Sequence, residues 1–194
     1  METAGMSTFA FDPPRGPLQP TVQVCAGRVL MLAGAAFGSA NIVQWGVLSG
    51  ALGWHPAVLA VSWPAAVVAF LVGLRRLRRV GGAAGIRVAS WSRAAILIQI
   101  AAALALLAGS AATGDWFLMR WTGAVGVTLY GVAWAVAALR SGSLAMGLLA
   151  TGAFAGIAAL AARIGSPDQY LISACALAFV ALLPGLWLAG GRRL

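Results

Sequence analysis

The chain has 194 residues, of which 61% are hydrophobic and only 9% are charged, and its mean hydropathy is +0.92. An average soluble domain carries about 25% charged residues, so this composition excludes an ordinary water-soluble globular protein. The net charge of +9 comes from 13 arginines, with no lysine, against four carboxylates. Because the arginines cluster at the ends of apolar runs, we attribute the charge to orientation in a membrane and expect no nucleic-acid partner.

The first 26 residues contain the Pro-rich stretch Asp12-Pro13-Pro14-Arg15-Gly16-Pro17 and no hydrophobic core of a signal peptide. We expect residues 1–26 to be a disordered cytoplasmic tail. A chain rich in Ala, Gly and Arg but without Lys is typical of a GC-rich bacterial genome. The expected location is therefore the bacterial inner (cytoplasmic) membrane.

Residues 27–194 contain long apolar runs, each close to the roughly 20 residues that cross a bilayer as a helix. They predict an all-α membrane protein with six transmembrane helices. The expected spans are 27–50, 56–74, 94–112, 116–139, 143–164 and 170–189. Pro64 and Pro184 lie inside spans two and six, where each is expected to kink its helix.

Arginine marks alternate connections between these runs, which predicts three helical hairpins with the N- and C-termini both cytoplasmic. Each hairpin turns at a Gly-containing connection that carries His55, Asp115 or Asp168, and returns to arginine. The pattern fits a threefold internal repeat. It equally fits any six-helix protein that obeys the positive-inside rule.

Gly34-xxx-Gly38 and Gly152-xxx-Gly156 place pairs of small residues on one face of spans one and five. Such faces allow close approach of helix backbones, either inside one chain or between chains. Packing inside the chain is the simpler interpretation. A homo-oligomer or a complex with other membrane proteins is the alternative.

Asn41, Gln44 and Gln99 are polar side chains at membrane depth, where hydrocarbon offers no hydrogen-bond partner. They are either interhelical hydrogen-bonding groups or a candidate polar path for a solute. His55, Asp115 and Arg120 are the candidate outer mouth of such a path. His55 and Arg120 also have simpler interpretations: His55 as a turn residue, and Arg120 as an interfacial anchor that stacks on Trp116 or approaches Asp115.

Charged residues elsewhere mark the ends of the spans. Arg163 and Asp168 are expected to form a local ion pair across the third turn. Arg75, Arg76, Arg78 and Arg79 begin a basic loop that extends to Arg93. We expect this loop to hold the orientation of the protein and to contact anionic lipid headgroups.

The sequence lacks the combinations of residues that most catalytic or metal sites need. The chain has one His and two Cys, Cys25 and Cys175, and these are expected to be plain small residues. We expect no metal, no cofactor and no enzymatic activity, because no metal-ligand set, phosphate loop or nucleophile–base set is present.

Two hypotheses remain for function. The first is a small-solute channel or transporter, and the second is a non-catalytic partner, scaffold or assembly protein that binds other membrane proteins or anionic lipids.

Overall fold

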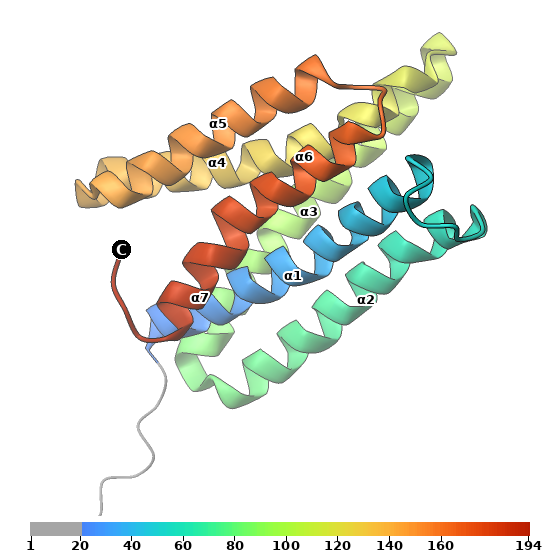
Figure 1. Cartoon of the computed structure of the whole chain (residues 1–194). Helices are drawn as coiled ribbons and strands as arrows, with labels where there is room; N and C mark the ends of the chain where they lie inside the picture. Colours follow the sequence, from blue (N-terminus) through green and yellow to red (C-terminus); the bar gives the residue numbers. More distant parts are fainter. Residues whose placement is uncertain (1–20) are drawn as a thin grey trace, which may run out of the picture.

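The computed structural model describes residues 21–194, and this part of the chain contains helices and turns but no strand. The elements are α1 (Val22–Leu48), α2 (Ala57–Val80), α3 (Gly82–Thr113), the 3-10 helix η1 (Trp116–Trp121), α4 (Thr122–Ser141), α5 (Leu144–Ala162), α6 (Asp168–Leu177), the π-helical segment η2 (Ala178–Leu182) and α7 (Leu183–Ala189). Figure 1 shows them as one bundle of long helices. The prediction of an all-α fold is confirmed for the described residues.

Six helical stretches in residues 21–194 are long and apolar enough to cross a membrane. They are α1, α2, α3, η1 with α4, α5, and α6 with η2 and α7. This number agrees with the six apolar runs in the sequence. By length and composition the chain is a multi-pass membrane protein.

The helix ends differ from the expected span ends in two places. α1 begins at Val22, where Thr21 caps it by accepting a hydrogen bond from the Val24 N–H at 3.3 Å. Residues 22–26 are therefore helical, and residues 1–20 of the expected tail lie outside the described residues. The predicted basic loop up to Arg93 is wrong, because α2 continues to Val80 and α3 already begins at Gly82.

The physical reason is that charge marks where a span leaves hydrocarbon, not where helical hydrogen bonding ends, and arginine is a good helix former. Two glycines make the sharp reversal possible. A Cβ on Gly81 would lie 2.7 Å from the Gly85 Cα, and Gly82 has a φ of +55°. The basic segment is thus a helical corner with a break at Gly81.

α1 runs through the bundle and contacts α2, α3, α6, η2 and α7. Its crossing with the last span is close because glycines on both helices lie against the backbone of the other helix. A Cβ on Gly34 would lie 2.6 Å from the Leu182 N, and one on Gly185 would lie 2.8 Å from the Met31 Cα. Side chains larger than hydrogen would push these two backbones apart.

The small-residue faces predicted from the sequence pack inside the chain. Gly152 contacts the Phe179 ring, and a Cβ on Gly156 would lie 3.2 Å from the Ala176 Cβ. Gly34 faces Leu182, whereas a Cβ on Gly38 would meet nothing within 4 Å. Three of these four glycines therefore serve contacts between helices of one chain.

Pro184 follows a change in helix type within the last span, from α-helix to a π-helical turn. Proline has no N–H, so it cannot donate to the carbonyl four residues earlier, which belongs to Val180. The indole Nε1 of Trp134 donates to this carbonyl instead, at 2.8 Å, and residues 178–182 form a π-helical turn. This bond joins α4 to the last span.

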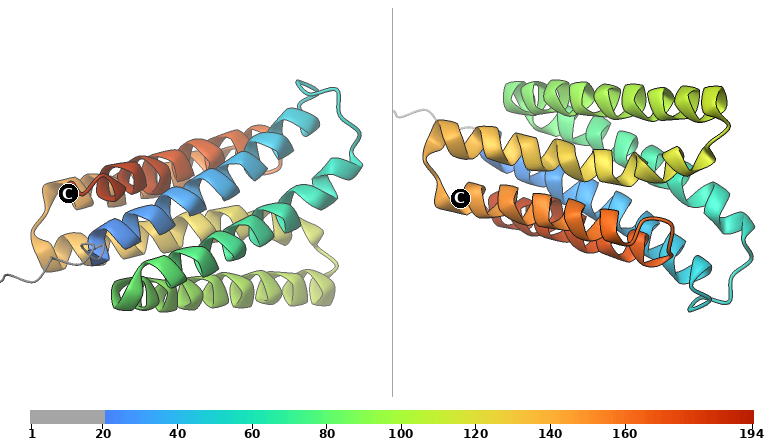
Figure 2. Two further views of the ribbon diagram at one scale, coloured as in Figure 1. Left: turned by 90° about the horizontal axis from the view of Figure 1, so that it is seen from below. Right: turned by 90° about the horizontal axis from the view of Figure 1, so that it is seen from above.

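The connections of the bundle divide between its two ends (Figures 1 and 2). One end, here called the basic end, carries the start of α1, the α2–α3 corner, the α4–α5 connection and the C-terminus. Its arginines include Arg28, Arg75, Arg76, Arg78, Arg79, Arg87, Arg140, Arg192 and Arg193. The other end, here called the turn end, carries the connections with His55, Asp115 and Asp168.

Candidate functional site

Gln44 joins α1 to α2. It is 7% exposed, and its Nε2 donates to the Leu59 carbonyl at 3.1 Å and to the Ser62 Oγ at 2.9 Å. The Ser62 hydroxyl in turn donates to the Leu59 carbonyl at 3.1 Å. The amide therefore closes a small hydrogen-bonded contact between two neighbouring helices.

Asn41 lies three residues before Gln44 and is 3% exposed. Its Nδ2 donates to the Phe37 carbonyl at 2.8 Å, one turn earlier in the same helix. This donor is satisfied inside α1. Asn41 and Gln44 share the first span but do not share a hydrogen-bond partner.

Gln99 belongs to a different helix contact. Its Nε2 donates to the Thr122 carbonyl at 3.1 Å, which joins α3 to the start of α4. Its Oε1 is buried without a hydrogen-bond partner among the described residues. Ser110, also on α3, is fully buried, and its Oγ likewise has no partner in the described part of the chain.

The three amides of the candidate path thus end on three different acceptors: the α2 backbone, the α1 backbone and the α4 backbone. The bonds of Gln44 and Gln99 are the interhelical hydrogen bonds expected from the sequence, whereas the bond of Asn41 stays within α1. Sequence reasoning missed Ser110, because a single serine in an Ala-rich span gives no signal of its own.

The candidate outer-mouth residues each make local contacts, and no hydrogen bond or ion pair joins the three described side chains. The His55 Nδ1 accepts from the Ala57 N–H at 3.2 Å at the start of α2. The Asp115 Oδ1 accepts from the Phe117 N–H at 2.9 Å and so caps η1. Both residues act as turn and capping groups in this structure.

Arg120 reaches the α5–α6 turn instead of Asp115 or Trp116. Its Nη1 donates to the Gly165 carbonyl at 3.2 Å, and its guanidinium lies over the Phe117 ring at 5.1 Å. The buried Gln169 accepts from the Gly165 N–H at 2.9 Å. Arg120 and Gln169 therefore bind the backbone carbonyl and N–H of the same residue. Gly165 has a φ of +93°, a conformation that favours glycine at this position.

The expected Arg163–Asp168 ion pair is present in the same turn. The Arg163 Nη1 and the Asp168 Oδ2 are 4.0 Å apart, and the two side chains are 65% and 53% exposed. Exposed pairs of this length contribute little to stability. Gln169 was not singled out from the sequence, although its position just after a Pro-Asp turn was a possible signal.

The α2–α3 corner at the basic end contains an open cavity. Arg75, Arg78, Arg79 and Ile86 line it, and its volume is about 430 Å³. No Asp or Glu side chain of residues 21–194 lies at this end, since the two acidic residues in this part of the chain, Asp115 and Asp168, belong to the turn end. The three guanidinium groups are therefore suited to an anion.

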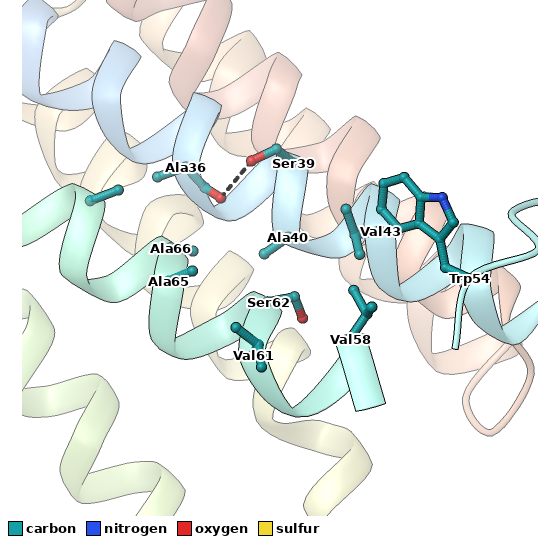
Figure 3. A pocket seen from close by; sticks show the side chains of 11 residues that line it. Ala36, Ser39, Ala40, Val43, Trp54, Val58, Val61, Ser62, Ala65 and Ala66 are labelled. Carbon is teal, nitrogen blue, oxygen red and sulfur yellow. Dashed lines mark hydrogen bonds between the residues drawn. The ribbon is translucent and has the colours of Figure 1, made fainter. Parts of the chain in front are cut away.

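A second hollow of about 350 Å³ lies between α1 and α2 (Figure 3). Its lining residues are mostly small and apolar: Ala36, Ser39, Ala40, Val43, Trp54, Val58, Val61, Ser62, Ala65, Ala66 and Ala69. Figure 3 shows the Ser39 hydroxyl turned to its own helix, where it donates to the Ala36 carbonyl at 3.0 Å. The Ser62 hydroxyl donates to Leu59, so this groove offers few free polar groups to a solute.

Residues 21–194 contain no group of three or more His, Cys, Asp or Glu side chains that could hold a metal ion. Cys25 is buried and Cys175 is exposed, and both are free thiols. Comparison with protein-family models, with curated proteins and with solved structures finds no match to this chain.

Proposed function

We propose that this chain is a non-catalytic bacterial inner-membrane protein that does not transport solutes, and that it acts by binding anionic lipids or other membrane proteins. The observation that supports this proposal best is the fate of the three buried amides. Each donates to a separate backbone acceptor, and none faces a polar cavity described above. A transport path needs such groups to line one continuous route.

The basic end supports the binding role. Arginine clusters there without an Asp or Glu side chain among the described residues of that end, and each cationic side chain near an anionic membrane surface contributes about 1 kcal/mol to attraction. Thermal unfolding in bilayer nanodiscs tests this role for the protein as a whole. We expect a higher midpoint in discs that contain phosphatidic acid or cardiolipin than in phosphatidylcholine discs. Equal midpoints in all three would contradict lipid binding.

The proposed topology has three helical hairpins with both termini in the cytoplasm, so that the basic end faces inward. Cysteine labelling in intact cells tests it in a background with Cys25 and Cys175 replaced by Ala. An impermeant maleimide should label Ala51→Cys in the α1–α2 connection but not Leu144→Cys at the basic end. The reverse pattern would refute the charge argument.

A small-solute channel or transporter is the second candidate, and one observation favours it. The buried Gln99 Oε1 and Ser110 Oγ, both on α3, have no partner among the described residues. Atoms of this kind are suited to water or a polar solute.

Flux into liposomes that contain the purified chain separates the two candidates. We expect uptake of small neutral solutes to equal that of protein-free liposomes. Uptake that Gln99→Leu abolishes and that Asn41→Leu leaves unchanged would establish transport and overturn the main proposal. Uptake lost in both variants would place both amides on the path.

A further inference from the structure

The α2 face that leads to the basic end changes from apolar to cationic along one line. Val68, Leu71 and Val72 are 59%, 40% and 44% exposed. Arg75 follows Leu71 by four residues and Val72 by three, and Arg78 and Arg79 follow Arg75 by three and four. Residues at these spacings are neighbours on a helix surface, so all six share one face of α2. A phospholipid has the same order of parts, with acyl chains followed by a charged headgroup.

The position of this line along α2 also fits a phospholipid. Residues 57–74 of α2 carry no charge, and at 1.5 Å per residue they extend about 27 Å, close to the thickness of a hydrocarbon core. Arg75 follows directly, so the three guanidinium groups lie at the depth of the headgroups.

The α2–α3 corner supplies the other wall. Because the chain reverses at Gly81 without a loop, the start of α3 lies against the end of α2, and Ile86 lines the same cavity as the arginines. Arg76 does not line this cavity, and it lies about 100° from Arg75 around the helix. One arginine of the cluster is therefore outside the site while sharing its charge and its helix.

We infer that Arg75, Arg78 and Arg79, with Ile86, form a binding site for the phosphate-bearing headgroup of an anionic phospholipid, whose acyl chains lie along Val68, Leu71 and Val72. The inference rests on the proposed lipid-binding role and assigns it to one site. Guanidinium groups bind phosphate oxygens through paired hydrogen bonds, which a headgroup with an exposed phosphate accepts best. Phosphatidic acid, with a terminal phosphate, and cardiolipin, with two phosphates, have this chemistry.

Binding is measured on the full chain in neutral detergent, where no membrane surface attracts every arginine alike. Short-chain phosphatidic acid is the probe, and the readout is saturable binding by native mass spectrometry. Replacement of Arg75, Arg78 and Arg79 by Gln should weaken the affinity about a hundredfold, since each arginine near a headgroup contributes about fivefold. The matched control, Arg76→Gln, should change it by less than about twofold.

Two further arms make the result specific. Replacement of the same three arginines by Lys should weaken binding, because Lys lacks the paired donors of Arg. The loss should be smaller than with Gln, because Lys keeps the charge. Phosphatidylcholine of the same chain length and inorganic phosphate should show no saturable binding, since one lacks net charge and the other lacks acyl chains. Helical circular dichroism confirms that each variant is folded.

The possible outcomes separate the site from the wider proposal. If wild-type protein binds phosphatidic acid and the triple Gln variant binds it equally, or Arg76→Gln weakens it as much, the site is wrong and lipid binding stands. If wild-type protein binds no anionic lipid in detergent and none stabilises it in nanodiscs, the proposed function fails as well. Saturable binding of inorganic phosphate alone would replace the lipid with a soluble anion.

Discussion

The last span and α3 have nearly the same hydropathy and opposite places in the molecule. The most apolar stretch of the last span has a mean hydropathy of 2.2 and is 50% buried, whereas that of α3 has 2.1 and is 6% buried. Figure 2 shows α3 at the edge of the bundle and the last span against α1. Hydropathy measures preference for hydrocarbon over water, and it does not distinguish a lipid environment from a protein environment.

Small residues and hydrogen bonds make the difference. Gly185 allows the last span to touch α1, and Trp134 satisfies the Val180 carbonyl that Pro184 leaves free. On α3, by contrast, Leu97 and Leu104 are 62% and 58% exposed. Packing in a membrane depends on close backbone approach and polar pairing, because lipid tails are as apolar as leucine.

The largest expected effect comes from filling the α1–α7 crossing. Gly185→Val should lower the free energy of unfolding by about 3 kcal/mol, because its Cβ would lie 2.8 Å from the Met31 Cα and 2.9 Å from the Gly27 carbonyl oxygen. Unfolding by sodium dodecyl sulfate from mixed micelles measures it. Gly109→Ala on α3 is the control, since its Cβ would meet only the Leu118 Cδ1 at 3.8 Å. Equal losses in both variants would remove the contrast between the two helices.

Loss of the indole donor should have the next largest effect. Trp134→Phe keeps a six-membered aromatic ring but removes the indole N–H and part of a buried side chain. It leaves the Val180 carbonyl without this donor, which should cost about 2 kcal/mol in the same unfolding assay. Trp91→Phe on α3 changes a side chain that is 62% exposed and should have almost no effect. If Trp134→Phe were as mild, the π-helical turn would not depend on this bond.

Much of the fold followed from the sequence, for physical reasons that are particular to membranes. Long apolar runs predicted six helices, because hydrocarbon leaves a spanning backbone no other way to pair its polar groups. The α2–α3 corner was not predicted, because the arginines from Arg75 to Arg93 suggest a charged loop, whereas two glycines allow the helix to reverse at Gly81.

The hydrogen-bond partners of the buried amides were not predicted either. They depend on which helices are neighbours, and local sequence does not specify this. Asn41 and Gln44 are three residues apart, yet one bonds within α1 and the other bonds to α2.

A smaller effect should separate the amide of the α1–α2 contact from that of α3. Gln44→Leu removes two hydrogen bonds to α2 and should lower the free energy of unfolding by about 1 kcal/mol. Gln99→Leu removes one bond but also a buried Oε1 that has no partner in the described chain, so the two changes should nearly cancel. A loss for Gln99→Leu as large as that for Gln44→Leu would mean that its Oε1 is paired, for example by a water.

The smallest expected effect is at the turn end, where the last span begins. Asp168→Asn breaks the exposed pair with Arg163 and should change the free energy of unfolding by less than about 0.5 kcal/mol, with even less change in high salt. Gln169→Leu, one residue later, removes a buried acceptor from the Gly165 N–H and should have the larger effect. Comparison of the two variants at low and high salt therefore tests what holds the α5–α6 turn. If Asp168→Asn proves the more damaging and its effect disappears in salt, the turn depends on charge, and the buried amide is not what anchors the start of the last span.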